Sequence, residues 1–125
     1  MKKQFPSFPS YACANDSIQW TSHGFDFEAV IEYDTDTRPD DSECYDERQI
    51  RLWKSDQWFF CGVVLSVSFK GVKLSDHAAS LWGIECNLSN DNFYLSEVAQ
   101  DLEGEALEVA KDELTRIKKA LEVQA

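Results

Sequence analysis

The stretch Trp58–Phe69, with the sequence WFFCGVVLSVSF, is a nearly unbroken run of aromatic, β-branched and other apolar residues. Such a composition is typical of a β-strand that is covered on both of its faces. With a period of two, every second residue from Phe59 onward points to the same side, and we expect that side to lie in the core. The opposite side starts apolar and turns polar at Ser66 and Ser68. Another element of the fold, or a partner, must therefore cover its apolar part.

The segment Phe25–Tyr33 shows the second clear strand pattern. Its odd-numbered residues are apolar or aromatic, whereas its even-numbered residues include Asp26, Glu28 and Glu32. Alternation of this kind predicts an amphipathic strand with one face on the core and one face in water. The water-facing side of this strand is therefore expected to be acidic.

Shorter segments around these two strands complete the predicted sheet. Further strands are expected at Ser17–Thr21, Arg48–Lys54, Val72–Leu74 and Ser80–Cys86. Polar residues and glycines predict turns at Ser22–Gly24, Lys70-Gly71 and Ser75–His77, and a hairpin turn at Lys54–Gln57. The sheet would then be an antiparallel meander in which each strand pairs with the next.

From Asn92 to Glu122 the apolar residues recur at intervals of three and four, which is the spacing of one helix face. A long helix with one apolar face needs a sheet to cover. We therefore predict an α+β domain in which an antiparallel β-meander of about four to five strands packs against one long C-terminal α-helix. Residues 1–15 are expected to form an irregular N-terminal arm, and residues 16–125 a single domain, because 125 residues suffice for one core.

The chain carries 23 acidic side chains against 12 lysines and arginines, which gives a formal net charge of −11. This excess argues against direct binding to nucleic acid or to anionic membranes, because both need clustered basic side chains. It suits a basic protein partner instead, since complementary surface potentials steer association. The alternative is that the acidity serves only solubility.

Two neighbouring segments could concentrate this charge into a binding surface. The acidic side of Phe25–Tyr33 would continue into the loop Asp34–Glu47, which holds seven acidic residues and only one basic residue, Arg38. Carboxylates in a row on a rigid scaffold can present to a basic groove what a phosphate backbone presents. The alternative is an ordinary solvated face. The candidate partner-binding carboxylates are Asp26, Glu28, Glu32, Asp34, Asp36, Asp40, Asp41 and Glu43.

Two tryptophans are candidate anchors beside this acidic surface. Trp53 and Trp58 flank the predicted hairpin turn, where an exposed indole could act as an interface hot spot. Burial in the core is the alternative for both, because a tryptophan side chain buries a large apolar area.

No catalytic or metal motif has the spacing that its chemistry needs. The acidic loop lacks the glycine of a calcium loop and places Arg38 and Pro39 at ligand positions. Asp76 and His77 lie near serines, as in a hydrolase triad, but neighbours in one turn do not give triad geometry, so a hydrolase is kept as an alternative hypothesis. Burial of Cys61 would raise its pKa. We expect no cofactor, no metal ion and no enzymatic activity.

The N-terminus begins with lysines, as a signal peptide does, but it lacks the apolar segment and contains Pro6 and Pro9. The sequence also has no apolar run long enough to span a membrane. We therefore expect a cytoplasmic protein in which the four cysteines are free thiols.

The C-terminal half, from Trp58 through the segment Ser80-Leu81-Trp82-Gly83-Ile84-Glu85 into the alanine- and glutamate-rich helix, resembles small uncharacterised proteins of tailed phages and prophages. The resemblance implies a mobile-element origin and favours a host-directed inhibitor. In size and charge, the chain is also similar to anti-CRISPR and anti-restriction proteins.

The leading hypothesis is therefore an acidic, non-enzymatic, phage-encoded binding protein. It would occupy the basic surface of a host defence or nucleic-acid-binding protein by mimicking nucleic acid. One alternative is an immunity protein that neutralises a nuclease toxin. Another is a phage structural or accessory protein that forms a homodimer through its long helix.

Overall fold

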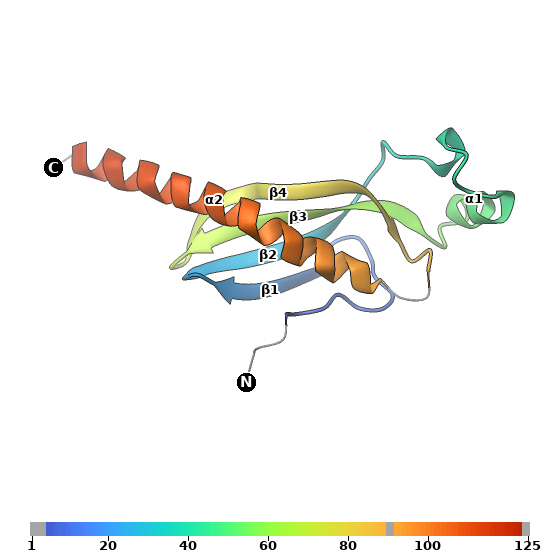
Figure 1. Cartoon of the computed structure of the whole chain (residues 1–125), viewed down its shortest axis with the longest axis horizontal. Helices are drawn as coiled ribbons and strands as arrows, with labels where there is room; N and C mark the ends of the chain where they lie inside the picture. Colours follow the sequence, from blue (N-terminus) through green and yellow to red (C-terminus); the bar gives the residue numbers. More distant parts are fainter. Residues whose placement is uncertain (1–4, 90–91, 124–125) are drawn as a thin grey trace.

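The computed structural model describes residues 5–89 and 92–123. In chain order, the elements are β1 (Ser17–Ser22), β2 (Phe25–Tyr33), the 3-10 helix η1 (Pro39–Asp41), α1 (Glu47–Lys54), β3 (Phe59–Phe69), β4 (Val72–Cys86) and α2 (Phe93–Val123). The four strands form one sheet in the order β1-β2-β3-β4, with every pair antiparallel. The long helix α2 lies across one face of this sheet (Figure 1). The predicted α+β meander with a C-terminal helix is confirmed.

Two tight turns set the register of the meander. His23-Gly24 joins β1 to β2, and Lys70-Gly71 joins β3 to β4. All four residues have positive φ, at 55° and 83° in the first turn and 49° and 81° in the second. Two central residues with positive φ are what a type I′ hairpin turn requires, and this turn matches the twist of the flanking strands. The glycines at the second positions adopt this conformation without steric cost.

The main core lies between the sheet and α2. Alternate side chains of β2 and β3, including Ile31 and Leu65, are fully buried there. From the helix, Leu95 is fully buried together with several alanines, such as Ala99 and Ala106. Because the side chain of alanine is small, the backbone of α2 can approach the strands closely at these positions. No residue of α2 after Ala110 is buried in the described part of the helix, and its last turns extend past the strands (Figure 1).

The segment before β1 is irregular and lies against this core. Phe8 is buried, and its N–H donates to Ser96 Oγ at the start of α2. Further along, Ala12 exchanges hydrogen bonds with the side chain of Asn87, which also accepts one from Asn92. These two asparagines connect the arm to the junction between β4 and α2, so the arm is held in place against the domain.

The strand predicted at Arg48–Lys54 is wrong, because these residues belong to helix α1. Asp46 and Gln49 form a capping box: each side chain accepts a hydrogen bond from the other residue's backbone N–H. The helix then ends with Asp56 at φ 62° and a hydrogen bond from Gln57 N to Leu52 O. A start signal and a stop signal therefore mark the two ends of the helix, and the predicted hairpin turn at Lys54–Gln57 is its C-terminal end.

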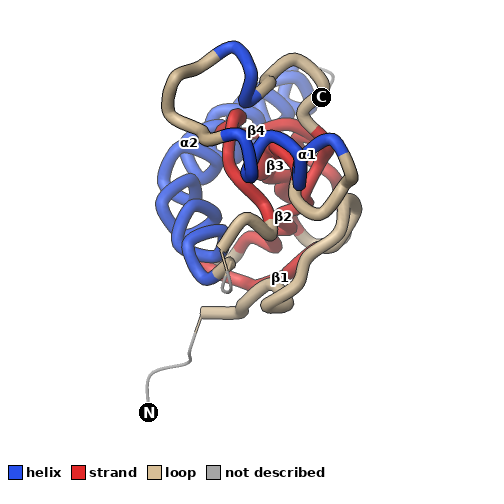
Figure 2. The backbone as a smooth tube through the Cα atoms, turned by 90° about the vertical axis from the view of Figure 1, so that its right-hand side faces the viewer, coloured by secondary structure: helices blue, strands red, loops and turns tan. Residues whose placement is uncertain are grey.

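Trp58 is not an exposed anchor, as only 1% of its surface is accessible. Its indole stacks on Tyr45 at 5.5 Å, meets the ring of Phe60 edge-on at 5.1 Å, and donates from Nε1 to Gln49 O at 2.8 Å. Phe60 points away from α2, so these rings form a second small core behind the start of β3. The loop and α1 thereby cover Phe60 on the second side of β3, at the end of the sheet where α1 lies (Figure 2).

The two strands and the turn predicted between Val72 and Cys86 are in fact one strand. The pairing of β3 with β4 shifts register at three places, and the polar segment around Asp76 is accommodated as extra residues within β4. A further extra residue falls near Gly83, which has φ 74°. Such bulges bend a strand without ending it.

We expect the two halves of α2 to differ sharply in their contribution to stability. Leu95→Ala removes a fully buried side chain and should lower the free energy of unfolding by about 2–5 kcal/mol. Leu121→Ala is the matched control, because Leu121 is 66% exposed, and it should change this free energy by less than about 0.5 kcal/mol. Urea unfolding of the three proteins measures both effects, and similar losses for the two variants would contradict this packing.

Candidate functional site

The side of the sheet opposite α2, here called the open face, carries the acidic row that the alternation of β2 predicts. Asp26 and Glu32 are exposed and Glu28 is half-buried. Their cross-strand neighbours on β3 are Ser68, Gly62 and Ser66, respectively. None of the three carboxylates takes part in an ion pair among the described residues. The strand therefore fixes the spacing of these carboxylates, and no lysine or arginine of the described chain forms an ion pair with them.

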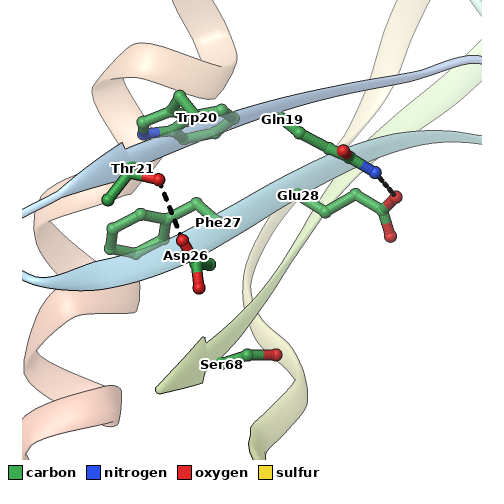
Figure 3. A pocket seen from close by; sticks show the side chains of 7 residues that line it. All are labelled: Gln19, Trp20, Thr21, Asp26, Phe27, Glu28 and Ser68. Atoms are coloured by element: carbon green, nitrogen blue, oxygen red, sulfur yellow. Dashed lines mark hydrogen bonds between the residues drawn. The ribbon is translucent and has the colours of Figure 1, made fainter. Parts of the chain in front are cut away.

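Neighbouring polar side chains fix two members of this row. Thr21 Oγ1 donates to Asp26 Oδ1, and Gln19 Nε2 donates to Glu28 Oε2, both at 2.8 Å (Figure 3). Together with Ser68, these side chains surround a shallow polar depression of about 490 Å³ on the open face (Figure 3). A two-residue step along a strand separates the Cα atoms of Asp26 and Glu28 by roughly 6.8 Å. The two carboxylates can therefore meet two separate cationic groups of one partner.

An aromatic side chain that the sequence did not single out completes the open face on β4. Trp82 is 42% exposed, and its ring lies so close over Gly62 that a Cβ there would come within 2.3 Å of the ring. Trp82 Nε1 donates to Ser80 Oγ at 3.1 Å, and Ser80 Oγ is 2.8 Å from His77 Nε2. Because Gly62 is also the partner of Glu32, the indole stands beside the end of the acidic row.

Asp34 follows the row but points inward and is 8% exposed. Its Oδ1 accepts hydrogen bonds from the N–H groups of Asp36 and Thr37, and its Oδ2 accepts from Thr37 Oγ1 and from the N–H of Gly83. Burial alone would raise the pKa of Asp34, but these hydrogen bonds together lower it below its usual value. Asp34 is therefore an ionised structural anchor that ties the loop to β4, and its expected role as an outward-facing contact is wrong.

The loop tied down by Asp34 forms one wall of a cleft of about 440 Å³ beside the open face. Trp82 of β4 also lines this cleft. The lining residues are Tyr33, Asp34, Thr35, Asp36, Thr37 and Trp82. Asp36 is exposed at this cleft, and no hydrogen bond or ion pair engages its carboxylate within the described residues.

The rest of the acidic loop does not continue the row. Arg38 makes a two-pronged contact with Asp40, with an ion-pair distance of 2.9 Å, and its guanidinium stacks 4.8 Å from the ring centre of Trp53. This contact lowers the pKa of Asp40 and partly covers Trp53. Asp41 and Glu43 are exposed, and the negative charge of Asp41 helps to raise the pKa of Arg38. Of the eight predicted carboxylates, the three of the β2 row lie on the open face, and Asp36 lines the cleft beside it.

The other chemistries considered from the sequence find little support in the geometry. Asp76 pairs with Lys73 at 3.4 Å, whereas His77 contacts Ser80, so the Asp76–His77 pair does not assemble as a triad. Cys61 is buried, and both its hydrogen bond with Cys86 and its burial raise the pKa of its thiol. Within residues 5–89 and 92–123, no three His, Cys, Asp or Glu side chains gather in a metal-binding group.

Comparisons of the chain with known protein families, with curated proteins and with solved structures find no match. Among the helices in the described ranges, none has an apolar stretch that could cross a membrane.

We expect Asp34→Asn to lower the free energy of unfolding by about 1.5–3 kcal/mol at pH 7. The amide would turn an NH₂ group toward donors that now bind Oδ2. Because the pKa of Asp34 is lower in the folded state, its stabilisation is complete above the unfolded-state pKa of about 3.9 and is lost as the pH falls further.

Urea unfolding at pH 7, 4 and 3 should therefore show the gap between the original protein and Asp34→Asn narrowing toward low pH. Asp41→Asn is the control, since Asp41 is exposed and should show almost no gap at any pH. A gap that widens on acidification would mean that the carboxylate does not hold the loop.

Proposed function

We propose that this protein is a non-enzymatic binding protein whose open face occupies a basic surface of another protein. The observation that carries the proposal is the β2 row: Asp26, Glu28 and Glu32 on one rigid strand, facing solvent, with no ion-pair partner in the described chain. A net charge of −11 adds a long-range field of the same sign. Clustered carboxylates without internal cations favour a partner that supplies lysine or arginine.

The physical arrangement suits a surface that otherwise binds nucleic acid. A nucleic-acid-binding groove holds cations in rows to match phosphates, and it recognises charge and spacing more than chemical identity. The row offers carboxylates at fixed strand spacing, and the flanking hydroxyl and amide groups of Thr21 and Gln19 hold two of them in place. Pre-ordered side chains reduce the entropy lost on binding.

The biological setting of the proposal comes from the sequence resemblance to small phage and prophage proteins. We place the protein in the host cytoplasm, where it would inhibit a host defence or nucleic-acid-processing protein by excluding its nucleic acid. The protein's own acidity disfavours direct contact with nucleic acid, so the two would compete for one basic surface.

Competitive capture from bacterial lysate tests this function. The sheet variant carries Asp26→Asn, Glu28→Gln and Glu32→Gln. The helix variant carries Glu97→Gln, Asp101→Asn and Glu105→Gln, which removes one aspartate and two glutamate charges, as the sheet variant does, from exposed positions of α2. The original protein and the helix variant should retain the same proteins, and duplex DNA or salt raised from about 0.1 to about 0.5 M should release them. The sheet variant should retain on the order of tenfold less.

Quantitative mass spectrometry of the retained fractions gives the measurement, and matching far-UV circular dichroism shows that both variants are folded. Equal retention by the sheet variant would remove the β2 row from the proposal. Retention that duplex DNA does not reverse would remove competition with nucleic acid.

A further inference from the structure

We propose that the cleft between Trp82 and the 33–37 segment is a receptor for a single guanidinium group, an arginine side chain of the basic partner. The cleft has a volume of about 440 Å³, toward the lower end of the range of roughly 300–1,000 Å³ seen for small-molecule sites. An aromatic ring and carboxylates converge on it from two segments that are far apart in sequence. The inference rests on the proposed function only in taking the arginine from a protein partner.

Trp82 supplies the aromatic wall in a defined position. Its ring is supported from below by Gly62, where no side chain intervenes, and its Nε1 is held by Ser80 Oγ. The indole is still 42% exposed and lines the cleft. An indole is the most favourable aromatic partner for a cation, and a planar, weakly hydrated guanidinium stacks on it better than an ammonium group does.

The two carboxylates of the cleft have different tasks. Asp34 already accepts four hydrogen bonds, two on each oxygen, so it has no free position for an incoming donor. All four donors are neutral, and Asp34 forms no ion pair within the described residues, so no cation of the described chain compensates its negative charge beside the cleft. Asp36 is exposed and its carboxylate is available. Asp36 would thus accept the hydrogen bonds of the guanidinium group, whereas Asp34 contributes a negative electrostatic potential and holds the loop in shape.

The cleft contrasts with the other place where this chain already binds a guanidinium. Arg38 stacks on Trp53 and pairs with Asp40, which is the same combination of indole and carboxylate. That site is filled from within the chain, whereas the combination of Trp82 and Asp36 has no internal arginine or lysine among the described ion pairs and ring contacts. The chain therefore fills the site at Trp53 and Asp40 with its own arginine, whereas the site at Trp82 and Asp36 has no cation from the described chain.

Titration of the isotope-labelled full chain with N-acetyl-arginine amide tests the site without any partner. The Trp82 indole N–H resonance, assigned by its absence in Trp82→Phe, should shift saturably with the arginine amide. N-acetyl-citrulline amide has the same shape without the charge and should cause no saturable shift, and N-acetyl-lysine amide should bind more weakly. Asp36→Asn should weaken arginine binding by about fivefold or more, while Asp41→Asn, outside the cleft, should leave it unchanged.

No saturable shift with the arginine amide, an equal shift with citrulline, equal affinity for lysine, or full affinity in Asp36→Asn would each overturn the inference. Asp36 is exposed, and an unchanged amide spectrum outside the cleft confirms that its variant is folded. If the sheet variant retains fewer proteins than the original, as the proposed function predicts, and this titration fails, only the guanidinium site is wrong. If the titration succeeds and the sheet variant captures proteins normally, the proposed role of the β2 row is wrong and the guanidinium site stands.

Discussion

The structure depends on the burial of β3 from both sides. Its odd-numbered side chains, such as Val63 and Leu65, lie under α2 in the main core. Its other side needs cover too, and it receives this from two separate sources: the rings of Trp58 and Tyr45 behind Phe60, and the indole of Trp82 over Gly62. These rings cover the start of β3 on the open face, whereas β1, β2 and the far end of β3 present polar side chains there. The acidic row lies along this polar part.

The buried charge of Asp34 links this sheet to the irregular loop. A carboxylate that accepts four neutral hydrogen bonds keeps its charge without a cation nearby, in agreement with the rule that a buried ion must be fully satisfied. Its bond from Gly83 N joins residues 49 positions apart. The bulge at Gly83 turns that N–H toward the loop, so an irregularity of β4 positions the segment that lines the cleft. The register shift near Gly83 and the shape of the cleft are therefore coupled.

Sequence patterns predicted the elements whose periodicity extends over many residues. Nine alternating residues define β2, an apolar run defines β3, and the long helical spacing defines α2. The eight residues of α1 are too few for periodicity to decide, and the capping pair Asp46 and Gln49 was the available local signal. The continuity of β4 had no local signal, because the polar segment around Asp76 resembles a turn and only its pairing with β3 keeps it extended.

The same distinction divides the candidate site. On a strand, alternation determines which way a side chain points, so Asp26, Glu28 and Glu32 were placed correctly on the outer side. In a loop, direction depends on distant contacts, and neither the inward turn of Asp34 nor the pairing of Asp40 with Arg38 follows from composition. No sequence pattern indicates the position of Trp82, because that position depends on Gly62, which lies on another strand and leaves room for the ring. Net charge therefore indicates the kind of partner that we propose, whereas cross-strand contacts determine which carboxylates and rings the proposed surface presents.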